Sequence, residues 1–580
     1  MSGARSDRPT RTARTGGPLR SRLPLTVWAI TALWAAVLLG AGLVWPMAYG
    51  YDEPQHIDMA YVYSGAPFHF YDPAQLPPTR ASVGVQTRQP GFPPRVAFLD
   101  APIEPRGERP SFAQMGGRDF VVDGQPNQMM QHPPLYYWAM AVVLRVPGVD
   151  HLAWDVQVWL MRLVSSIFLL PLPALCWATM RRLLQVRRPV ASGATPVGDE
   201  AARESRIEAS AAGLTAAAVL LTIPNLARDG SAVTNDTLLV LAGSVLVWGL
   251  VRVMTGDLGL RVATWVSAAL AVALLTKGFG LVFPPVILAA YLMAAGRRRT
   301  DGGVGRAMAA LVRPLLVVAA GGAIGMTWWV RNLVLYKTLQ VNGLGEATQL
   351  KVYGPLDGGG PISRFVPEFS SQFIMRIWGG IGLADTPSMG PVLTYGWFAL
   401  VVVGILVACT ARSRNGARGM SLVLTAAVLL TFVVVGAGSQ ATNSKWSFII
   451  AGAQGRYVYH LVIVLAAVSV LGWVRVLRPA ALPLLAPVVL IGGLVTTVTA
   501  WVFVIEQWYT PLKGSGPGTL VSGLHGLLRW SPLPSAPTLL LVVVLPAVTS
   551  IVALVVLVLD GRARAREVHD VEERLGLAPV

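Results

Sequence analysis

Two adjacent carboxylates, Asp52 and Glu53, follow the first long apolar stretch of the sequence, and His56 lies about one helical turn further on. Carboxylates at a membrane boundary cost solvation energy, and ionisable groups within a membrane are functional by default. One interpretation is that a carboxylate here deprotonates an acceptor hydroxyl, while His56 tunes it or binds substrate. The other is that the pair stabilises the N-terminus of a solvated helix. Position alone leaves both interpretations open.

Three cations lie beside apolar stretches and away from the main arginine clusters: Lys277, Arg331 and Arg456. A guanidinium fork suits phosphate oxygens, and the ammonium of Lys277 can meet a phosphate as a point charge. The alternatives are ordinary ion pairs for the arginines and, for the lysine, snorkelling toward the lipid headgroups. Tyr457 follows Arg456 directly.

A third motif, His132-Pro133-Pro134-Leu135-Tyr136-Tyr137, combines a rigid turn with an aromatic anchor. The apolar run 132–144 is too short to span a membrane. It is therefore expected as an interfacial helix with Tyr136, Tyr137 and Trp138 at headgroup level. Further along, Thr234-Asn235-Asp236 is most simply a helix cap, and Gly321 with Gly325 favours close helix packing.

The elements that must position these residues are membrane spans. Of the 580 residues, 53% are hydrophobic and only 13% are charged, whereas soluble proteins carry roughly a quarter charged residues. The apolar residues come in blocks of about twenty without a formal charge, long enough to cross a bilayer. This composition excludes a water-soluble protein, and the recurrence of the blocks excludes a single-anchor protein. The fold class is an all-α polytopic membrane protein.

The formal charge of +17 comes largely from arginine clusters between the apolar blocks. Clusters on one side of the membrane follow from the positive-inside rule. Because no recognition module accompanies the charge, nucleic-acid binding is not expected. Cys176 and Cys409 both lie in apolar blocks, so disulfides are not the stabilising device.

Taking the arginine clusters as cytoplasmic predicts about twelve spans, with both termini in the cytoplasm. They are expected at 25–45, 156–180, 209–226, 234–254, 261–277, 279–295, 314–335, 391–410, 420–438, 456–474, 482–504 and 537–559. The N-terminal segment resembles an uncleaved signal anchor of a plasma-membrane protein.

Two long segments are predicted on the outer face, 46–155 and 337–390, with a third, shorter one at 505–536. Long loops of this kind are usually functional, so the active site is expected to be extracytoplasmic. The proposed organisation is a basic cytoplasmic tail at 1–24, a catalytic membrane module at 25–480, C-terminal spans at 481–560 and a cytoplasmic tail at 561–580. No Walker loop, GxGxxG, HExxH or EF-hand loop is present, which argues against a nucleotide-driven pump and a cytosolic sugar-nucleotide donor.

Together the motifs resemble the C-type (GT-C) membrane glycosyltransferases, especially the bacterial branch related to protein mannosyltransferases and aminoarabinose transferases. The resemblance extends over about residues 25–475. It is carried by Asp52-Glu53 with His56, His132-Pro133-Pro134-Leu135-Tyr136-Tyr137, Asn235-Asp236, Thr276-Lys277-Gly278, Arg331-Asn332, Trp378-Gly379-Gly380 with Gly382, and Gln454-Gly455-Arg456-Tyr457.

The resemblance implies transfer of a sugar from a polyprenyl-phosphate-linked donor to a hydroxyl of a glycan, lipid or protein acceptor. Asp52 would be the catalytic base, with Glu53 supporting the acceptor or the fold. Arg456 would hold the lipid phosphate, and Lys277 and Arg331 are further candidates. The remaining substrate-binding candidates are His56, His132, Tyr136 and Tyr457. Some relatives use a divalent metal and others do not. No ligand spacing is evident here, so no obligate metal or other cofactor is expected.

Two other functions fit a polytopic protein. A transporter or flippase of lipid-linked glycans would show inverted repeats with interrupted helices and charges near the midplane, whereas here the candidate groups cluster at the outer ends of spans. A non-catalytic partner in cell-envelope assembly would tolerate loss of Asp52.

Overall fold

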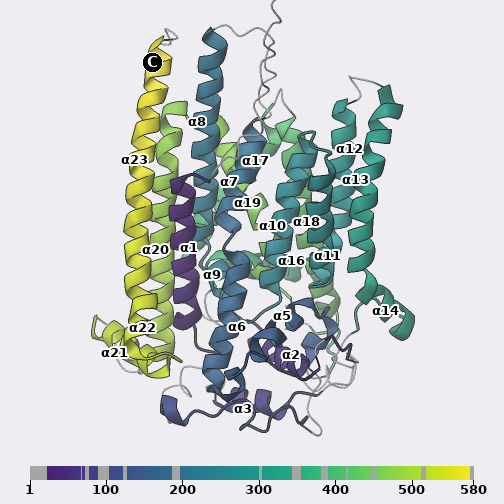
Figure 1. The fold of residues 1–580 in the computed structure, drawn as a ribbon, viewed down its shortest axis with the longest axis vertical. Helices are drawn as coiled ribbons and strands as arrows, with labels where there is room; N and C mark the ends of the chain where they lie inside the picture. The colour runs from purple at the N-terminus through teal and green to yellow at the C-terminus, as the bar shows by residue number, and fades with distance from the viewer. Residues whose placement is uncertain are drawn as a thin grey trace, which may run out of the picture.

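The computed structural model describes residues 23–66, 68–71, 77–88, 104–121, 127–185, 196–298, 303–341, 355–380, 389–412, 416–446, 452–510 and 517–574. Throughout these ranges the fold is helical, and the only β pairing is an isolated antiparallel bridge between Thr79 and Phe120 (Figure 1). Most of the basic N-terminal tail, with the glycine Gly382 of the Trp378 motif, lies outside the described residues.

Ten helical segments of the described chain are long and apolar enough to cross a membrane. They comprise α1 (Leu25–Val44), α6 (Trp154–Leu169) with α7 (Leu172–Gln185), α10 (Asp236–Met254), η5 (Gly278–Val282) with α12 (Phe283–Arg298), α13 (Gly303–Gly325), α17 (Pro391–Thr410), α18 (Ala417–Asn443), η7 (Gly455–Leu461) with α19 (Val462–Val476), α20 (Leu482–Tyr509), and α22 (Ser535–Leu539) with η9 (Leu540–Val544) and α23 (Leu545–Arg574). The polytopic all-α architecture is confirmed.

The expected number of twelve spans is not confirmed. The segment predicted at 209–226 is a pair of helices, α8 (Pro196–Val219) with η4 (Leu220–Thr222) and α9 (Pro224–Gly230), bent by 75° at the break. Counting this pair as one span gives eleven among the described residues. The segment predicted at 261–277 is α11 (Leu260–Leu274), whose 15 residues are fewer than the roughly 20 that a span needs.

The span predicted at 314–335 is also displaced. Helix α13 ends at Gly325, and a separate helix, α14 (Thr327–Tyr336), projects from the bundle at the lower right of Figure 1. The predicted packing role of the glycines is confirmed. A Cβ on Gly321 would lie 2.3 Å from the carbonyl oxygen of Ser267, and one on Gly325 would lie 2.7 Å from the side chain of Leu274. These two glycines therefore let α13 approach α11 closely.

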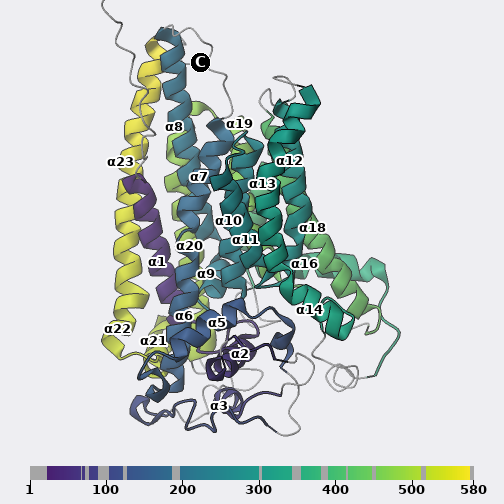
Figure 2. The ribbon, with the colours of Figure 1, turned by 45° about the vertical axis from the view of Figure 1, so that its right-hand side comes forward.

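The first outer loop folds into short helices at one end of the bundle, opposite the end at which α7, α12 and α23 finish (Figures 1 and 2). They are α2 (Glu53–Gly65), α3 (Arg80–Arg88), η1 (Arg106–Glu108), η2 (Gln128–Gln131), α5 (Leu135–Leu144) and η3 (Val149–His151). Asp58 on α2 joins them because its carboxylate accepts hydrogen bonds from the N–H and hydroxyl of Thr79 and from the amide of Asn127.

The expected interfacial role of Tyr136 and Tyr137 is wrong. Both side chains are fully buried, and their hydroxyls bond Ser165 and His56 respectively. The tyrosines face inward because α5 packs between α2 and α6, so that these rings fill the protein interior while Trp138 stays half-buried.

The second and third outer segments also contain helices that the sequence patterns did not predict: α16 (Ile362–Trp378) and α21 (Pro517–Trp530). Helix α16 packs against α17 and η7. Arg376 near its end donates to the carbonyl oxygen of Ala453, just before the segment that carries Arg456.

The centre of the bundle is formed by α10 and α19, the most deeply buried of the spans. Gly243 on α10 lets these elements meet, because a Cβ there would lie 2.1 Å from the carbonyl oxygen of His460 on η7. The tight contact at Gly243 fixes η7, and with it Arg456, against α10.

Cys176 and Cys409 are both free, as expected.

Candidate functional site

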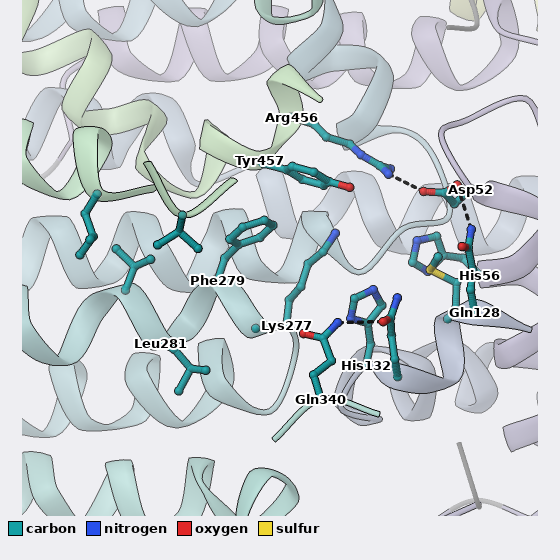
Figure 3. Close-up of a pocket in the computed structure, with 16 residues that line it drawn as sticks. Asp52, His56, Gln128, His132, Lys277, Phe279, Leu281, Gln340, Arg456 and Tyr457 are labelled. Carbon is teal, nitrogen blue, oxygen red and sulfur yellow. Dashed lines mark hydrogen bonds and ion pairs between the residues drawn. The ribbon is translucent and has the colours of Figure 1, made fainter. Parts of the chain in front are cut away.

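A pocket of about 520 Å³ lies between the first outer loop, which includes η2, and the elements η5, η7 and α18. Figure 3 shows its two halves. Charged and polar side chains, including Asp52, Lys277 and Arg456, occupy one half, and apolar side chains occupy the other. The apolar wall consists of Phe279, Leu281, Val282, Leu430 and Val434. The pocket is therefore amphipathic, with its cations next to an apolar surface.

Six of the nine residues predicted for the site line this pocket: Asp52, His56, His132, Lys277, Arg456 and Tyr457. They come from four segments, 52–56, 132, 277 and 456–457, which are separated by long stretches of sequence. The structure brings them together although nothing in their spacing requires it.

Asp52 and Arg456 form an ion pair at the pocket wall, with 2.5 Å between Oδ2 and Nη2 (Figure 3). Arg456 is buried, whereas the side chain of Asp52 is 35% exposed. The backbone of Asp52 is left-handed, with φ of 55°, a conformation that Asp adopts more readily than most residues. Its other carboxylate oxygen accepts a hydrogen bond of 3.5 Å from Gln128. The carboxylate of Asp52 thus faces the pocket and also contacts the buried guanidinium of Arg456.

Lys277 is held by the carboxylate of Asp236, a residue whose sequence motif also fits a helix cap. Its Nζ lies 2.7 Å from Oδ1 of Asp236, the first residue of α10, and Oδ2 of Asp236 lies 3.6 Å from Arg456. Both Lys277 and Asp236 are buried. Snorkelling of Lys277 is therefore wrong, and capping is an incomplete description of Asp236. Two cations and two carboxylates alternate along the wall, and their formal charges cancel.

His56 and His132 stack at one side of this charged row, with ring centroids 6.5 Å apart. Nδ1 of His56 lies 2.8 Å from the hydroxyl of Tyr137. Burial, helped by the nearby charges of Lys277 and Arg456, keeps the pKa of His56 well below its ordinary value. Burial and the charge of Lys277 lower the pKa of His132 to about 3. Both rings are therefore neutral at pH 7, when they can exchange hydrogen bonds but add no positive charge.

This burial predicts a pH dependence of stability. Below pH 6.5 the unfolded chain binds a proton at residue 132, whereas the folded chain does not until about pH 3. The stabilising contribution of a neutral His132 is thus present above pH 6.5 and is lost as the pH falls toward 3. From pH 7 to pH 5 we expect the wild type to lose about 2 kcal/mol more unfolding free energy than His132→Gln.

Unfolding in detergent, measured at a series of pH values, checks this expectation. His151→Gln is the matched control, because the side chain of His151 is 85% exposed and its loss should leave the pH profile of the wild type unchanged. Parallel pH profiles for the wild type and His132→Gln would contradict the inference that the ring is buried and neutral.

Three predicted residues do not line the pocket. Glu53 points away from it into a fully buried ion pair with Arg162. Tyr136 lies behind α2, where its hydroxyl bonds Ser165. Arg331 sits on α14, with its guanidinium 5.4 Å from the ring centre of Trp328 and 5.7 Å from that of Phe70.

Two carboxylates beside the site were not predicted as site residues. Asp236 belonged to a motif that also fits a helix cap, so its pairing was hidden. Asp229, on the bent helix α9, is 3% exposed, and neither of its carboxylate oxygens has a hydrogen-bond partner among the described residues. The signal that would have found it is the adjacent charged pair Arg228-Asp229, which lies between two predicted spans.

Within the described ranges, no group of three or more His, Cys, Asp or Glu side chains is arranged to hold a metal ion. The expectation that the protein has no obligate metal stays a prediction. The chemistry available from the residues themselves is a partly exposed carboxylate for proton transfer and two cations for an anion.

No protein-family model and no curated protein matches the chain. Among solved structures it is similar to ArnT of Cupriavidus metallidurans bound to undecaprenyl phosphate, with 14% identity, a TM-score of 0.41 and coverage of 94% of this chain and 78% of ArnT. The apo form of ArnT gives 15% identity, a TM-score of 0.43 and coverage of 93% and 77%.

A third similar structure is the oligosaccharyltransferase of Archaeoglobus fulgidus in complex with zinc and sulfate. It has 12% identity and a TM-score of 0.40, and the match covers 85% of this chain and 54% of the oligosaccharyltransferase, about half its length.

Proposed function

We propose that this protein is a membrane glycosyltransferase that moves a sugar from a polyprenyl-phosphate donor to a hydroxyl acceptor, with Asp52 as the base. The observation that carries the proposal is the amphipathic pocket. A lipid-linked sugar phosphate joins an anion to an isoprenoid tail, and it therefore needs cations beside an apolar wall. Lys277 and Arg456 supply the cations, and Phe279, Leu281 and Leu430 belong to the wall. A water-soluble sugar nucleotide has no apolar tail to contact that wall.

The ion pairs suggest how donor binding would prepare the base. In the structure Arg456 is engaged by Asp52, and Lys277 by Asp236. A donor phosphate at Arg456 would compete with the carboxylate of Asp52 and release it toward the acceptor. The base would then be free only when a donor is present.

In the transfer itself, the acceptor oxygen forms a bond to the anomeric carbon while the bond from that carbon to the phosphate oxygen breaks. Asp52 takes the acceptor proton, and the electron pair leaves on the lipid phosphate. Arg456 and Lys277 stabilise the added negative charge, the usual role of fixed cations in such a site. Direct in-line displacement would invert the configuration at the anomeric carbon.

The proposed location of the chemistry is the extracytoplasmic face, with both termini in the cytoplasm. Support comes from the arrangement of the chain, because α2 and α5 lie at the end of the bundle opposite the basic ends of α7, α12 and α23 (Figure 1). Reporter fusions at Arg187 and Gly359 test this orientation. We expect the two reporters on opposite sides of the membrane.

The experiment that tests the function supplies purified protein with a panel of radiolabelled sugars linked to polyprenyl phosphate, together with cell-envelope acceptors. We expect release of polyprenyl phosphate and labelling of an acceptor by at least one donor. A matching panel of sugar nucleotides should give no transfer. The proposal would be contradicted if only sugar nucleotides labelled an acceptor. It would also be contradicted if no donor in either panel labelled one.

A transporter of lipid-linked glycans remains the second candidate because of one feature, the bent pair α8 and α9. It places Arg228 and Asp229 on α9, the short buried helix that follows the break, and interrupted helices with charges are typical of transporter substrate sites. Proteoliposomes separate the two functions. Movement of an intact donor across the bilayer without cleavage favours transport, whereas cleavage of the donor favours transfer.

A prediction for Arg456 follows from its proposed contact with the donor phosphate. Arg456→Gln should raise the KM for the donor at least tenfold and change the KM for the acceptor little, because a neutral amide cannot replace the guanidinium. Steady-state kinetics with each substrate varied separately checks this result. Arg331→Gln, outside the pocket, is the control, and an equal rise in both KM values for Arg456→Gln would count against a phosphate role.

A further inference from the structure

A second pocket, of about 390 Å³, lies at the opposite end of α2 from Asp52. Helix α2 has 13 residues, so the two pockets are separated by about 20 Å along its axis. Their linings share no residue. The second pocket is formed by the C-terminal end of α2, the turn that carries Arg118, the end of α5, and Gln157 near the start of α6. Its volume falls within the range of about 300–1,000 Å³ typical of small-molecule sites.

Two arginines in this pocket are fixed on the same residue. Arg118 donates from Nη2 to the hydroxyl of Ser64, at 2.7 Å, and from Nε to the carbonyl oxygen of Tyr61, at 3.2 Å. Arg145 donates from Nε to the carbonyl oxygen of Ser64, at 2.8 Å, and from Nη2 to that of Gly65, at 3.3 Å. Ser64 is itself buried, so both guanidiniums are held against a rigid base.

These bonds leave donors unused. An arginine has five N–H donors, and in the described part of the chain Nη1 of Arg118 and Nη1 of Arg145 have no hydrogen-bond partner. Neither guanidinium forms an ion pair there. Asp150 also lines the pocket, but its carboxylate is 62% exposed and lies 3.7 Å from His151. The pocket therefore contains two fixed cations and one carboxylate, and it has a net positive charge.

Gln157 adds a hydrogen-bond acceptor to the donors of the two arginines. Its side chain is 1% exposed, and its Nε2 donates to the carbonyl oxygen of Leu152. Its Oε1 has no partner among the described residues, so it is available as an acceptor in the pocket lining. Capping of α2 by arginines near its last carbonyls explains part of this arrangement. Helix capping does not explain why Arg145 keeps unused N–H donors. It also does not explain why a cavity lies here with Oε1 of the buried Gln157 as an acceptor.

We infer that this pocket binds a sugar unit that carries a carboxylate or a phosphate. The arginines would take the anionic group, because guanidiniums suit planar bidentate anions, and Oε1 of Gln157 would accept a hydroxyl of the ring. If the proposed transferase function holds, the occupant is an acidic unit of the acceptor glycan, bound about 20 Å from the sugar that receives the transfer.

Binding of short glycans to purified wild-type protein tests this inference without any need for transfer. The probes are trigalacturonate and its methyl ester, which has the same rings without the charges, together with glucose 1-phosphate and glucose. We expect the charged member of each pair to bind at least tenfold more tightly, and inorganic phosphate to compete. Equal affinities within each pair would overturn the inference.

The double variant Arg118→Gln/Arg145→Gln should lose at least tenfold in affinity for trigalacturonate. Because these arginines also cap α2, the thermal midpoint is measured for each variant, and Arg118→Lys/Arg145→Lys serves as a second variant that keeps the charges. We expect intermediate affinity for the lysine pair. Wild-type affinity in the glutamine pair would overturn the inference.

Two further measurements separate this inference from the proposed transferase function and from binding of a lipid headgroup. Asp52→Asn should bind trigalacturonate as the wild type does, so that a failed transferase assay leaves the binding result interpretable. Glycerol 3-phosphate and nanodiscs of anionic lipid test a lipid headgroup as the occupant. If these bind at Arg118 and Arg145 while trigalacturonate does not, the sugar assignment is wrong.

Discussion

Asp52→Asn is expected to lower kcat for sugar transfer by about 10²- to 10⁴-fold, the range typical of loss of a general base. The amide is nearly the same size as the carboxylate, so it fits the same space beside Arg456, but it cannot take a proton. The KM for the donor should stay the same or fall, because the donor phosphate no longer competes with a carboxylate for Arg456. Kinetics with the purified variant measures both quantities.

Two comparisons separate a catalytic from a structural role for Asp52. Asp119→Asn, an exposed position in the same loop, should be as active as the wild type. The thermal midpoint of Asp52→Asn should lie close to that of the wild type, because the amide oxygen can still accept a hydrogen bond from Arg456 and the buried guanidinium keeps its ion pair with Asp236. Full activity of Asp52→Asn would refute the assignment of the base, and a large fall in the midpoint would point to a structural role.

Arg162→Met is expected to prevent accumulation of folded protein, because it breaks a buried network. The guanidinium donates to both oxygens of Glu53, at 2.8 and 2.6 Å, and to the carbonyl oxygens of Gly42, Trp45 and Pro46. Glu53 also accepts from the N–H groups of Gly50 and Val233. Removing one partner of a buried pair leaves an uncompensated charge and costs about 3–5 kcal/mol.

The yield of monodisperse protein and its thermal midpoint in detergent measure this effect. Glu53→Gln should be milder, since an amide keeps part of the hydrogen bonding. The matched control is Arg364→Met, which breaks an ion pair with Glu368 in which the arginine side chain is 66% exposed. Such pairs contribute about 0–1 kcal/mol. Equal midpoints for Arg162→Met and Arg364→Met would contradict the structural role assigned to the Glu53 network.

These two predictions assign different roles to neighbouring carboxylates. Asp52 is partly exposed and faces the pocket, whereas Glu53 is fully buried behind it. The left-handed backbone at Asp52 separates them, because it ends the run of turns and bends that follows α1 and starts α2 at Glu53. A rigid Glu53 network would therefore hold the base in place from one residue away.

The spans themselves follow from composition. Runs of about twenty apolar residues can satisfy their backbone groups in a bilayer only as helices, and this local requirement made α1, α10, α17 and α20 predictable. It fails where length is marginal. The 15 residues of α11 and the break between α13 and α14 depend on neighbouring helices, and no window of sequence reveals them.

The amino-acid sequence by itself determined a polytopic helical protein and most of the charged groups at its site, because a charge beside an apolar span is costly and therefore conspicuous. Only the tertiary structure decided which charges meet. Arg456 and Asp52 are 404 residues apart, and Glu53 and Arg162 are 109 apart. Such pairs form when packing of whole helices brings distant segments together. Local sequence contains no information about that geometry, which is why Asp236 resembled a cap and why the pairing of Glu53 with Arg162 was not predicted.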